Sequence, residues 1–245
     1  MATLAGARRR ARPVLLFAVG LWSMATVVAA QPPDAQLRFA TAVELAKGHL
    51  TSSRELYALA QAARASLHGS HPIQELGNRI IGPIKQVDVR LADDVRTALR
   101  KPGRSIDAKV PVPQYDREVD EAFAALDRGL AAVIPADVRD SPGFQAQLIE
   151  RLLKTAADEY DESMKSGRIV RPVEYQDAYG FLRRVQALYN RALALASQSA
   201  TASLEALVAA FPGVVPPEKP VPANQVRALM TEISAALTAS VKTGS

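Results

Sequence analysis

The chain has no cysteine, few aromatic residues and only three histidines. Without cysteine it forms no disulfides and carries no Cys-x-x-Cys-His motif for haem, so its own core must hold the fold together. No Ser/His/Asp arrangement, glycine-rich phosphate loop or paired-histidine zinc motif is found. The sequence therefore predicts a protein that is not an enzyme. A metal-dependent enzyme is the least favoured alternative, because it needs more histidine than this chain offers.

Long apolar runs are missing beyond the N-terminal segment. Residues 1–30 begin with an arginine cluster, continue with an uncharged stretch from Val14, and end in small residues at Ala30. This pattern is typical of a cleavable secretory signal. The alternative is an uncleaved membrane anchor, although the stretch lies at the short end of what spans a bilayer. We expect a periplasmic protein with no stable membrane insertion after cleavage.

An excess of charge of one sign is also lacking once this signal is removed. Four of the 30 basic side chains lie in residues 1–30, which leaves 26 basic against 25 acidic side chains. The net charge of the mature chain is then about +1. The sequence pI of about 9.6 largely reflects the signal, so nucleic acid is not an expected partner.

Alternating β-branched runs are almost absent, and apolar residues recur at three- and four-residue spacing through residues 31–245. This periodicity predicts an all-α protein, an elongated antiparallel bundle of about six helices. We expect the helices at about 34–67, 72–100, 114–133, 142–166, 172–211 and 223–241. A Pro- and Gly-rich segment at 101–113 is the candidate internal boundary, and 212–222 is a proline-rich linker.

The stretch from Glu159 to Phe181 predicts two antiparallel helices joined at Gly167, with a Glu-Tyr pair on each side of the turn. At about 100° per residue, Glu159 and Glu174 fall on the apolar stripes of their helices. The hairpin offers six candidate ligands for a metal ion: Glu159, Glu162, Glu174, Tyr160, Tyr175 and Asp177.

A carboxylate on an apolar stripe must be paired, protonated or bound to a cation. Glu159 and Glu174 therefore either bond to Arg168, Arg171, tyrosine hydroxyls or free helix-end amides, or hold a hard cation. Oxygen ligands select hard cations, and a phenolate suits ferric iron, so iron is the candidate cofactor. A surface that docks a partner is the third possibility.

The same stretch resembles the periplasmic helical region of bacterial Ftr-type high-affinity iron permeases. The resemblance is carried by the residues Tyr160, Met164, Gly167, Ile169, Val170, Glu174, Tyr175 and Phe181. The segment Leu67 to Leu76 is similar to an upstream part of that region. The chain has no transmembrane permease domain and no Arg-Glu-x-x-Glu motif, so the resemblance does not extend to transport itself. It implies a free-standing relative of the periplasmic part.

A secondary metal candidate is formed by His68, His71 and Glu75, which lie close together in sequence. Because Gly69-Ser70 and Pro72 interrupt the spacing, these side chains are not expected on one helical face. His49 is alone in its segment and is expected on the surface.

These observations give two main hypotheses of function. In the first, the chain is an exported binding or accessory component of an iron-uptake system, whose partner is an inner-membrane iron permease or another periplasmic uptake component. In the second, it is a structural or interaction protein that docks onto a membrane partner and binds no metal.

Overall fold

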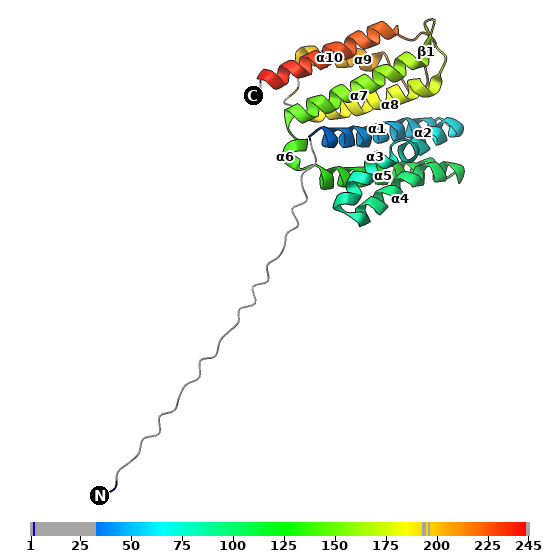
Figure 1. The fold of residues 1–245 in the computed structure, drawn as a ribbon. Coiled ribbons are helices and arrows are strands. Elements are labelled where there is room, and N and C mark those ends of the chain that lie inside the picture. Colours follow the sequence, from blue (N-terminus) through cyan, green and yellow to red (C-terminus); the bar gives the residue numbers. More distant parts are fainter. Residues whose placement is uncertain (1, 3–32, 193–194, 196, 244–245) are drawn as a thin grey trace. The chain divides into compact units, whose positions relative to one another are not determined.

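The computed structural model describes residues 2, 33–192, 195 and 197–243, and the predicted signal at 1–30 lies almost entirely outside them. The described residues form ten helices and one two-stranded hairpin, which confirms the all-α prediction (Figure 1). The elements are α1 (Pro33–Ala58), α2 (Ala62–Gln74), α3 (Gly77–Val87), α4 (Val89–Asp107), α5 (Val112–Val133), α6 (Ala136–Arg139), α7 (Pro142–Ser163), β1 (Met164–Lys165), β2 (Arg168–Ile169), α8 (Pro172–Arg191), α9 (Gln198–Ala209) and α10 (Ala223–Thr243).

Helix α1 is the central element of residues 33–243. It packs against α2, α3 and α5 on one side and against α7 and α8 on the other (Figure 1). Every residue from Ala42 to Leu50 is therefore buried. Because α1 is covered on both sides, polar side chains in its middle need partners inside the protein.

The predicted first helix at 34–67 is wrong, because α1 ends at Ala58. Ala60 adopts a positive φ of 58°, a left-handed conformation that stops a helix and turns the chain. Helix α2 then packs back on α1. The predicted break near Gly69 and Pro72 is also wrong, since α2 continues through both residues.

The predicted second helix at 72–100 is divided in a similar way. A new helix begins after Asp88, whose carboxylate accepts a hydrogen bond of 2.9 Å from the Leu91 backbone N–H, as an N-cap does. Helix α4 then passes through Lys101, Pro102 and Gly103, where the sequence predicted a stop. Pro102 is buried there, so packing outweighs the helical hydrogen bond that a proline removes.

The hairpin between α7 and α8 follows the sequence prediction closely. Ser141 caps α7 by accepting a hydrogen bond from Phe144 N–H, and Pro142 occupies the first helical position. Strands β1 and β2 pair antiparallel, and the two turn residues Ser166 and Gly167 both have positive φ. Such a turn matches the twist of a two-stranded hairpin.

The predicted fifth helix at 172–211 is wrong in its length, because α8 ends at Arg191 and a separate helix α9 follows. Helices α9 and α10 pack together, and α10 also packs on α7 (Figure 1). The segment 212–222 between them contains neither helix nor strand, as predicted.

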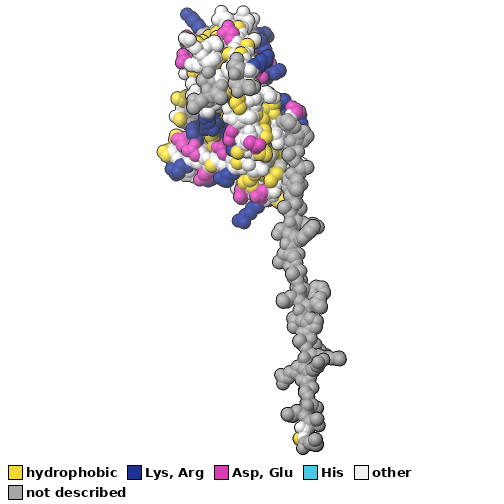
Figure 2. All heavy atoms as spheres, turned by 90° about the vertical axis from the view of Figure 1, so that its left-hand side faces the viewer, with side chains coloured by type: hydrophobic (Ala, Val, Ile, Leu, Met, Phe, Trp, Pro, Cys, Tyr) yellow, Lys and Arg dark blue, Asp and Glu magenta, His cyan; other side chains and the backbone are white. Residues whose placement is uncertain are grey.

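One face of the molecule carries charge of both signs. Figure 2 shows acidic and basic side chains interspersed over the face that it presents, with apolar side chains between them. A surface of this kind gives no single-sign field to attract a polyanion. None of the helices in the described part of the chain is long and apolar enough to cross a membrane.

Candidate metal centre

All three histidines of the chain meet at one place, together with one carboxylate of α8. Each of the residues His49, His68, His71 and Asp177 offers a ligand atom, and these four atoms lie within 4.8 Å of one another. His49, His68 and Asp177 are buried, with 3%, 0% and 7% exposure. Imidazole nitrogens and carboxylate oxygens are common ligands of first-row transition metals.

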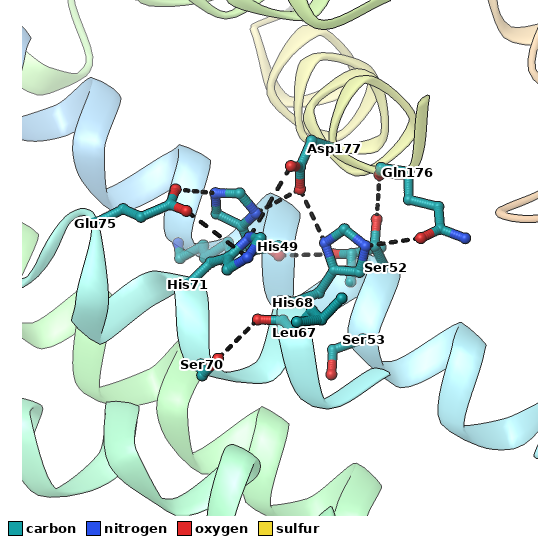
Figure 3. Close-up of polar contacts among 12 residues, drawn as sticks. His49, Ser52, Ser53, Leu67, His68, Ser70, His71, Glu75, Gln176 and Asp177 are labelled. Atoms are coloured by element: carbon teal, nitrogen blue, oxygen red, sulfur yellow. Dashed lines mark hydrogen bonds and ion pairs between the residues drawn. The ribbon is translucent and has the colours of Figure 1, made fainter. Parts of the chain in front are cut away.

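Three helices supply these side chains. His49 comes from α1, His68 and His71 lie three residues apart on α2, and Asp177 lies near the start of α8 (Figure 3). A spacing of three residues places two side chains on the same face of a helix. The continuation of α2 through Gly69 and Pro72 is therefore what brings His68 and His71 together, against the sequence prediction.

Asp177 is the centre of the cluster. Its Oδ1 lies 2.6 Å from His49 Nδ1 and 2.9 Å from His68 Nδ1. Its Oδ2 lies 4.0 Å from His71 Nδ1, which is beyond hydrogen-bonding distance. Figure 3 shows the carboxylate pointing from α8 toward the three rings.

Glu75 follows α2 directly and lies at the side of the cluster away from Gln176 (Figure 3). Its Oε1 is 3.7 Å from His71 Nε2 and its Oε2 is 3.8 Å from His49 Nε2. The side chain of Glu75 is 54% exposed. It therefore connects the buried cluster with solvent.

Mutual electrostatics fix the charges inside the cluster. Burial by itself raises the pKa of Asp177, but His49 and His68 outweigh burial and hold this pKa well below its usual range. Burial by itself lowers the pKa of His68, but the hydrogen bond and charge of Asp177 outweigh burial and raise it. Burial, followed by the charge of His49, lowers the pKa of His71. The cluster thus favours an anionic Asp177 and disfavours a proton on His71.

Two buried polar atoms at the cluster have no hydrogen-bond partner among the described residues. They are His71 Nδ1 and Gln176 Nε2. Gln176 uses its Oε1 to accept from His68 Nε2 at 2.9 Å. Ser52 donates a hydrogen bond of 2.6 Å to the Gln176 backbone carbonyl, which fixes α8 against α1. An unpartnered imidazole nitrogen facing a carboxylate is the arrangement that a metal ion completes.

The structure divides the ligand set predicted on the α7–α8 hairpin. Of its six members, Asp177 joins the cluster, together with the histidines of the secondary set. The phenol of Tyr160 donates instead to the Val221 carbonyl at 2.6 Å, and that of Tyr175 donates to the Gly213 carbonyl at 2.9 Å. Burial raises the pKa of Tyr160 to about 12 and raises that of Tyr175 further. Both phenols hold the proline-rich segment in place.

The glutamates of the predicted set lie outside the cluster. Glu162 and Glu174 both pair with Arg171, one of the arginine partners considered for Glu174 from the sequence. Glu159 is partly buried, and burial followed by the charge of Asp177 raises its pKa to about 7. The negative charge of the cluster therefore acts on Glu159, although no hydrogen bond links Glu159 to the cluster among the described residues.

The prediction that His49 lies on the surface is wrong, because His49 is buried between α2 and α8. A signal for this was present in the sequence. His49 follows Ala42 and Leu45 at helical spacing and precedes Ser52 and Leu56 at the same spacing, so it falls on an apolar stripe. Phase analysis of α1, as applied to the hairpin helices, places His49 inside.

Part of the chain matches a known protein family. Residues 135–244 match the family described as the iron permease-associated 4-helix bundle domain. This range contains the four long helices α7, α8, α9 and α10. No curated protein and no solved structure shows significant similarity to the chain. Asp177 lies within the matched range, whereas the three histidines precede it.

Proposed function

We propose, from the iron permease-associated 4-helix bundle domain that residues 135–244 form, that this chain is an exported accessory component of an iron-uptake system and binds a metal ion at His49, His68, His71 and Asp177. The domain links the chain to iron uptake. The cluster adds a place where a metal ion can be held. Its partner in this proposal is an inner-membrane iron permease or another periplasmic uptake component.

The observation that carries the proposal is the convergence of every histidine of the chain on one buried carboxylate. Three imidazoles and a carboxylate in a protein interior are costly unless each polar atom finds a partner. Purely structural contacts of Asp177 with His49 and His68 account for three of these four groups. They leave His71 Nδ1 without a partner, and a metal ion gives that nitrogen one.

We propose binding rather than catalysis as the role of this site. Cavities of about 630 and 480 Å³ in the described part of the chain lie elsewhere, and none of the four cluster residues lines them. The four ligand atoms of the cluster lie within 4.8 Å of one another, a spacing that suits a single ion. Ligand sites of drug-like size are clefts of several hundred Å³.

Export forms the second part of the proposal. The basic, apolar and small-residue regions of residues 1–30 support secretion, and the absence of cysteine is compatible with an oxidising compartment. In the periplasm the chain would encounter iron before the iron reaches an inner-membrane permease. We therefore place the mature protein, from Gln31 to Ser245, on the outer side of the inner membrane.

The test is a thermal melt of the mature chain after removal of metals with a chelator. A ligand that binds only the folded state raises the melting temperature as its concentration rises. We expect such a rise with at least one of Fe²⁺, Co²⁺, Zn²⁺ and ferric citrate, and we expect His71→Gln to abolish it. His71 is the least buried histidine of the cluster, so this variant should still fold.

Glu205→Gln serves as the control, because Glu205 is an exposed glutamate on α9, outside the cluster. It should melt and bind as the unmodified chain does. If no ion raises the melting temperature, direct metal binding is excluded. The chain is then better described as an interaction protein that docks onto a membrane partner.

A further inference from the structure

Tyr160 and Tyr175, which the sequence suggested as ligands of ferric iron, form hydrogen bonds to the backbone instead. The phenols of Tyr160 and Tyr175 donate to the carbonyls of Val221 and Gly213, and both rings pack against Phe211. Binding a cation as phenolates would break both of these hydrogen bonds. A phenolate site is therefore disfavoured at this end of the fold.

The cluster that is assembled has a different ligand chemistry. Three of its four ligand residues are imidazoles, and one is a carboxylate. Imidazole nitrogen suits divalent iron, zinc, copper and nickel, and sets of histidines with a carboxylate are typical of ferrous iron. Ferric iron is a harder ion and favours a set richer in anionic oxygen.

The charge of the ligand residues also favours a divalent ion. Within the cluster, Asp177 is the buried anion, and Glu75 adds a second carboxylate at the exposed side. A divalent ion held by neutral imidazoles is neutralised by these two carboxylates. A trivalent ion would leave an uncompensated positive charge in a largely buried site, which is strongly unfavourable.

From these contacts we infer that the cluster takes a divalent first-row transition-metal ion, with ferrous iron as the iron species, and that Glu75 is its solvent-side ligand. This inference rests on the proposed function, and it names the class of ion that the site holds. Glu75 lies within 3.8 Å of both His49 and His71. A small movement of its exposed side chain brings a carboxylate oxygen onto an ion between them.

The experiment is an anaerobic titration of the metal-free mature chain with Fe²⁺ and with Co²⁺, compared with an aerobic titration with ferric citrate. We expect Fe²⁺ and Co²⁺ to bind at one ion per chain and to compete with each other. Co²⁺ also reports its ligands through its visible absorption. We expect ferric iron to bind at least 100-fold more weakly than Fe²⁺.

Three variants assign the ligands. Glu75→Gln should weaken Fe²⁺ and Co²⁺ about tenfold or more, the effect expected when a ligand or its immediate support is removed. Glu205→Gln should not change the affinity. Tyr175→Phe should leave the affinity unchanged while lowering the melting temperature, because it removes only a structural hydrogen bond.

The outcomes separate this inference from the proposed function. Ferric iron that binds as tightly as Fe²⁺ and is lost in His71→Gln would overturn the divalent assignment and leave metal binding at the cluster intact. Ferric binding that is lost in Tyr175→Phe instead would overturn both. Unchanged Co²⁺ affinity in Glu75→Gln would remove Glu75 from the site.

Discussion

Glu159 is a carboxylate whose surroundings oppose its charge. It lies on α7, and burial followed by the charges of Asp177, Glu162, Glu174 and Glu75 raises its pKa to about 7, from an ordinary value of 4.5. Arg171 of the same hairpin pairs with Glu162 and Glu174, and no ion pair of Glu159 is found among the described residues. Ionised Glu159 therefore destabilises the folded state of the metal-free protein.

The first prediction concerns how this destabilisation depends on pH. Below about pH 4.5 Glu159 is protonated in both the folded and the unfolded chain, so it has no effect on stability. As pH rises from 4.5 to 7 the unfolded state loses the proton first, and the free energy of unfolding falls. We expect Glu159→Gln to raise stability by about 1–3 kcal/mol at pH 8, and by little at pH 4.5.

Thermal melts of the metal-free chain at the two pH values measure this difference. Glu205→Gln is the matched control, because Glu205 is exposed on α9 and is not among the charges that raise the pKa of Glu159. A surface substitution of this kind changes the free energy of unfolding by about 0.5 kcal/mol or less. An equal gain from Glu159→Gln at both pH values would show that the charge of Glu159 is not the cause.

At the scale of the helices, the cluster depends on how closely α1 approaches α8. Two glycines face each other at the crossing: a Cβ on Gly180 would overlap the carbonyl of Gly48 and lie 2.6 Å from Ser52 Oγ. A Cβ on Gly48 would lie 2.5 Å from Phe181 Cδ1. Because glycine has no side chain, the backbones of α1 and α8 come into direct contact here. This contact places His49 within hydrogen-bonding distance of Asp177.

The second prediction is that Gly180→Ala separates α1 from α8. Overpacking a tight contact costs about 1–3 kcal/mol, so the melting temperature should fall by roughly 2–12 °C. Because Asp177 precedes Gly180 by less than one helical turn, the affinity for Co²⁺ should fall as well. Calorimetry measures both quantities on the same sample.

Gly82→Ala provides the contrast for this substitution. Gly82 is an exposed glycine inside α3, and a Cβ there would meet no atom within 4 Å. Alanine favours a helix over glycine by about 1 kcal/mol, so this variant should be slightly more stable, with unchanged affinity. If Gly180→Ala behaves in the same way, the close contact of α1 and α8 is not needed for the cluster.

The sequence predicted some of these elements well and others poorly, for identifiable reasons. The α7–α8 hairpin was predictable because Ser141, Pro142 and Gly167 mark its ends through local backbone chemistry. The division of the N-terminal helices was not predictable in this way. The chain reverses at Ala60 without a glycine or proline signal, while Pro72 and Pro102 lie inside helices.

The candidate site was only partly predictable for a related reason. Asp177, His68, His71 and Glu75 were candidates from local patterns, but they were assigned to two separate sets. Their union depends on α2 packing against α1 and α1 packing against α8. The α1–α8 contacts join residues more than 100 positions apart in the chain, such as His49 and Asp177, and no local pattern of residues encodes them.

On the scale of the whole molecule, the cluster joins two parts of the chain. Residues 135–244, which match the iron permease-associated 4-helix bundle domain, supply Asp177. The preceding helices supply all three histidines and Glu75. Helix α1 packs on α7 and α8 across this division, so the two parts share one core. Metal binding in our proposal is therefore a property of the joined protein and not of the matched domain.

The third prediction follows from this division. Produced separately, fragments 31–134 and 135–245 should each fail to bind Co²⁺, because each holds only part of the ligand set and exposes the apolar surface that α1 shares with α8. Produced together, they should copurify through a tag on one fragment, because this surface is reburied, and Co²⁺ binding should return at one ion per pair. Adding His71→Gln to the first fragment should abolish that recovery without preventing copurification. Full Co²⁺ affinity in fragment 135–245 alone would show that the metal site lies within the domain and that the histidine cluster is structural.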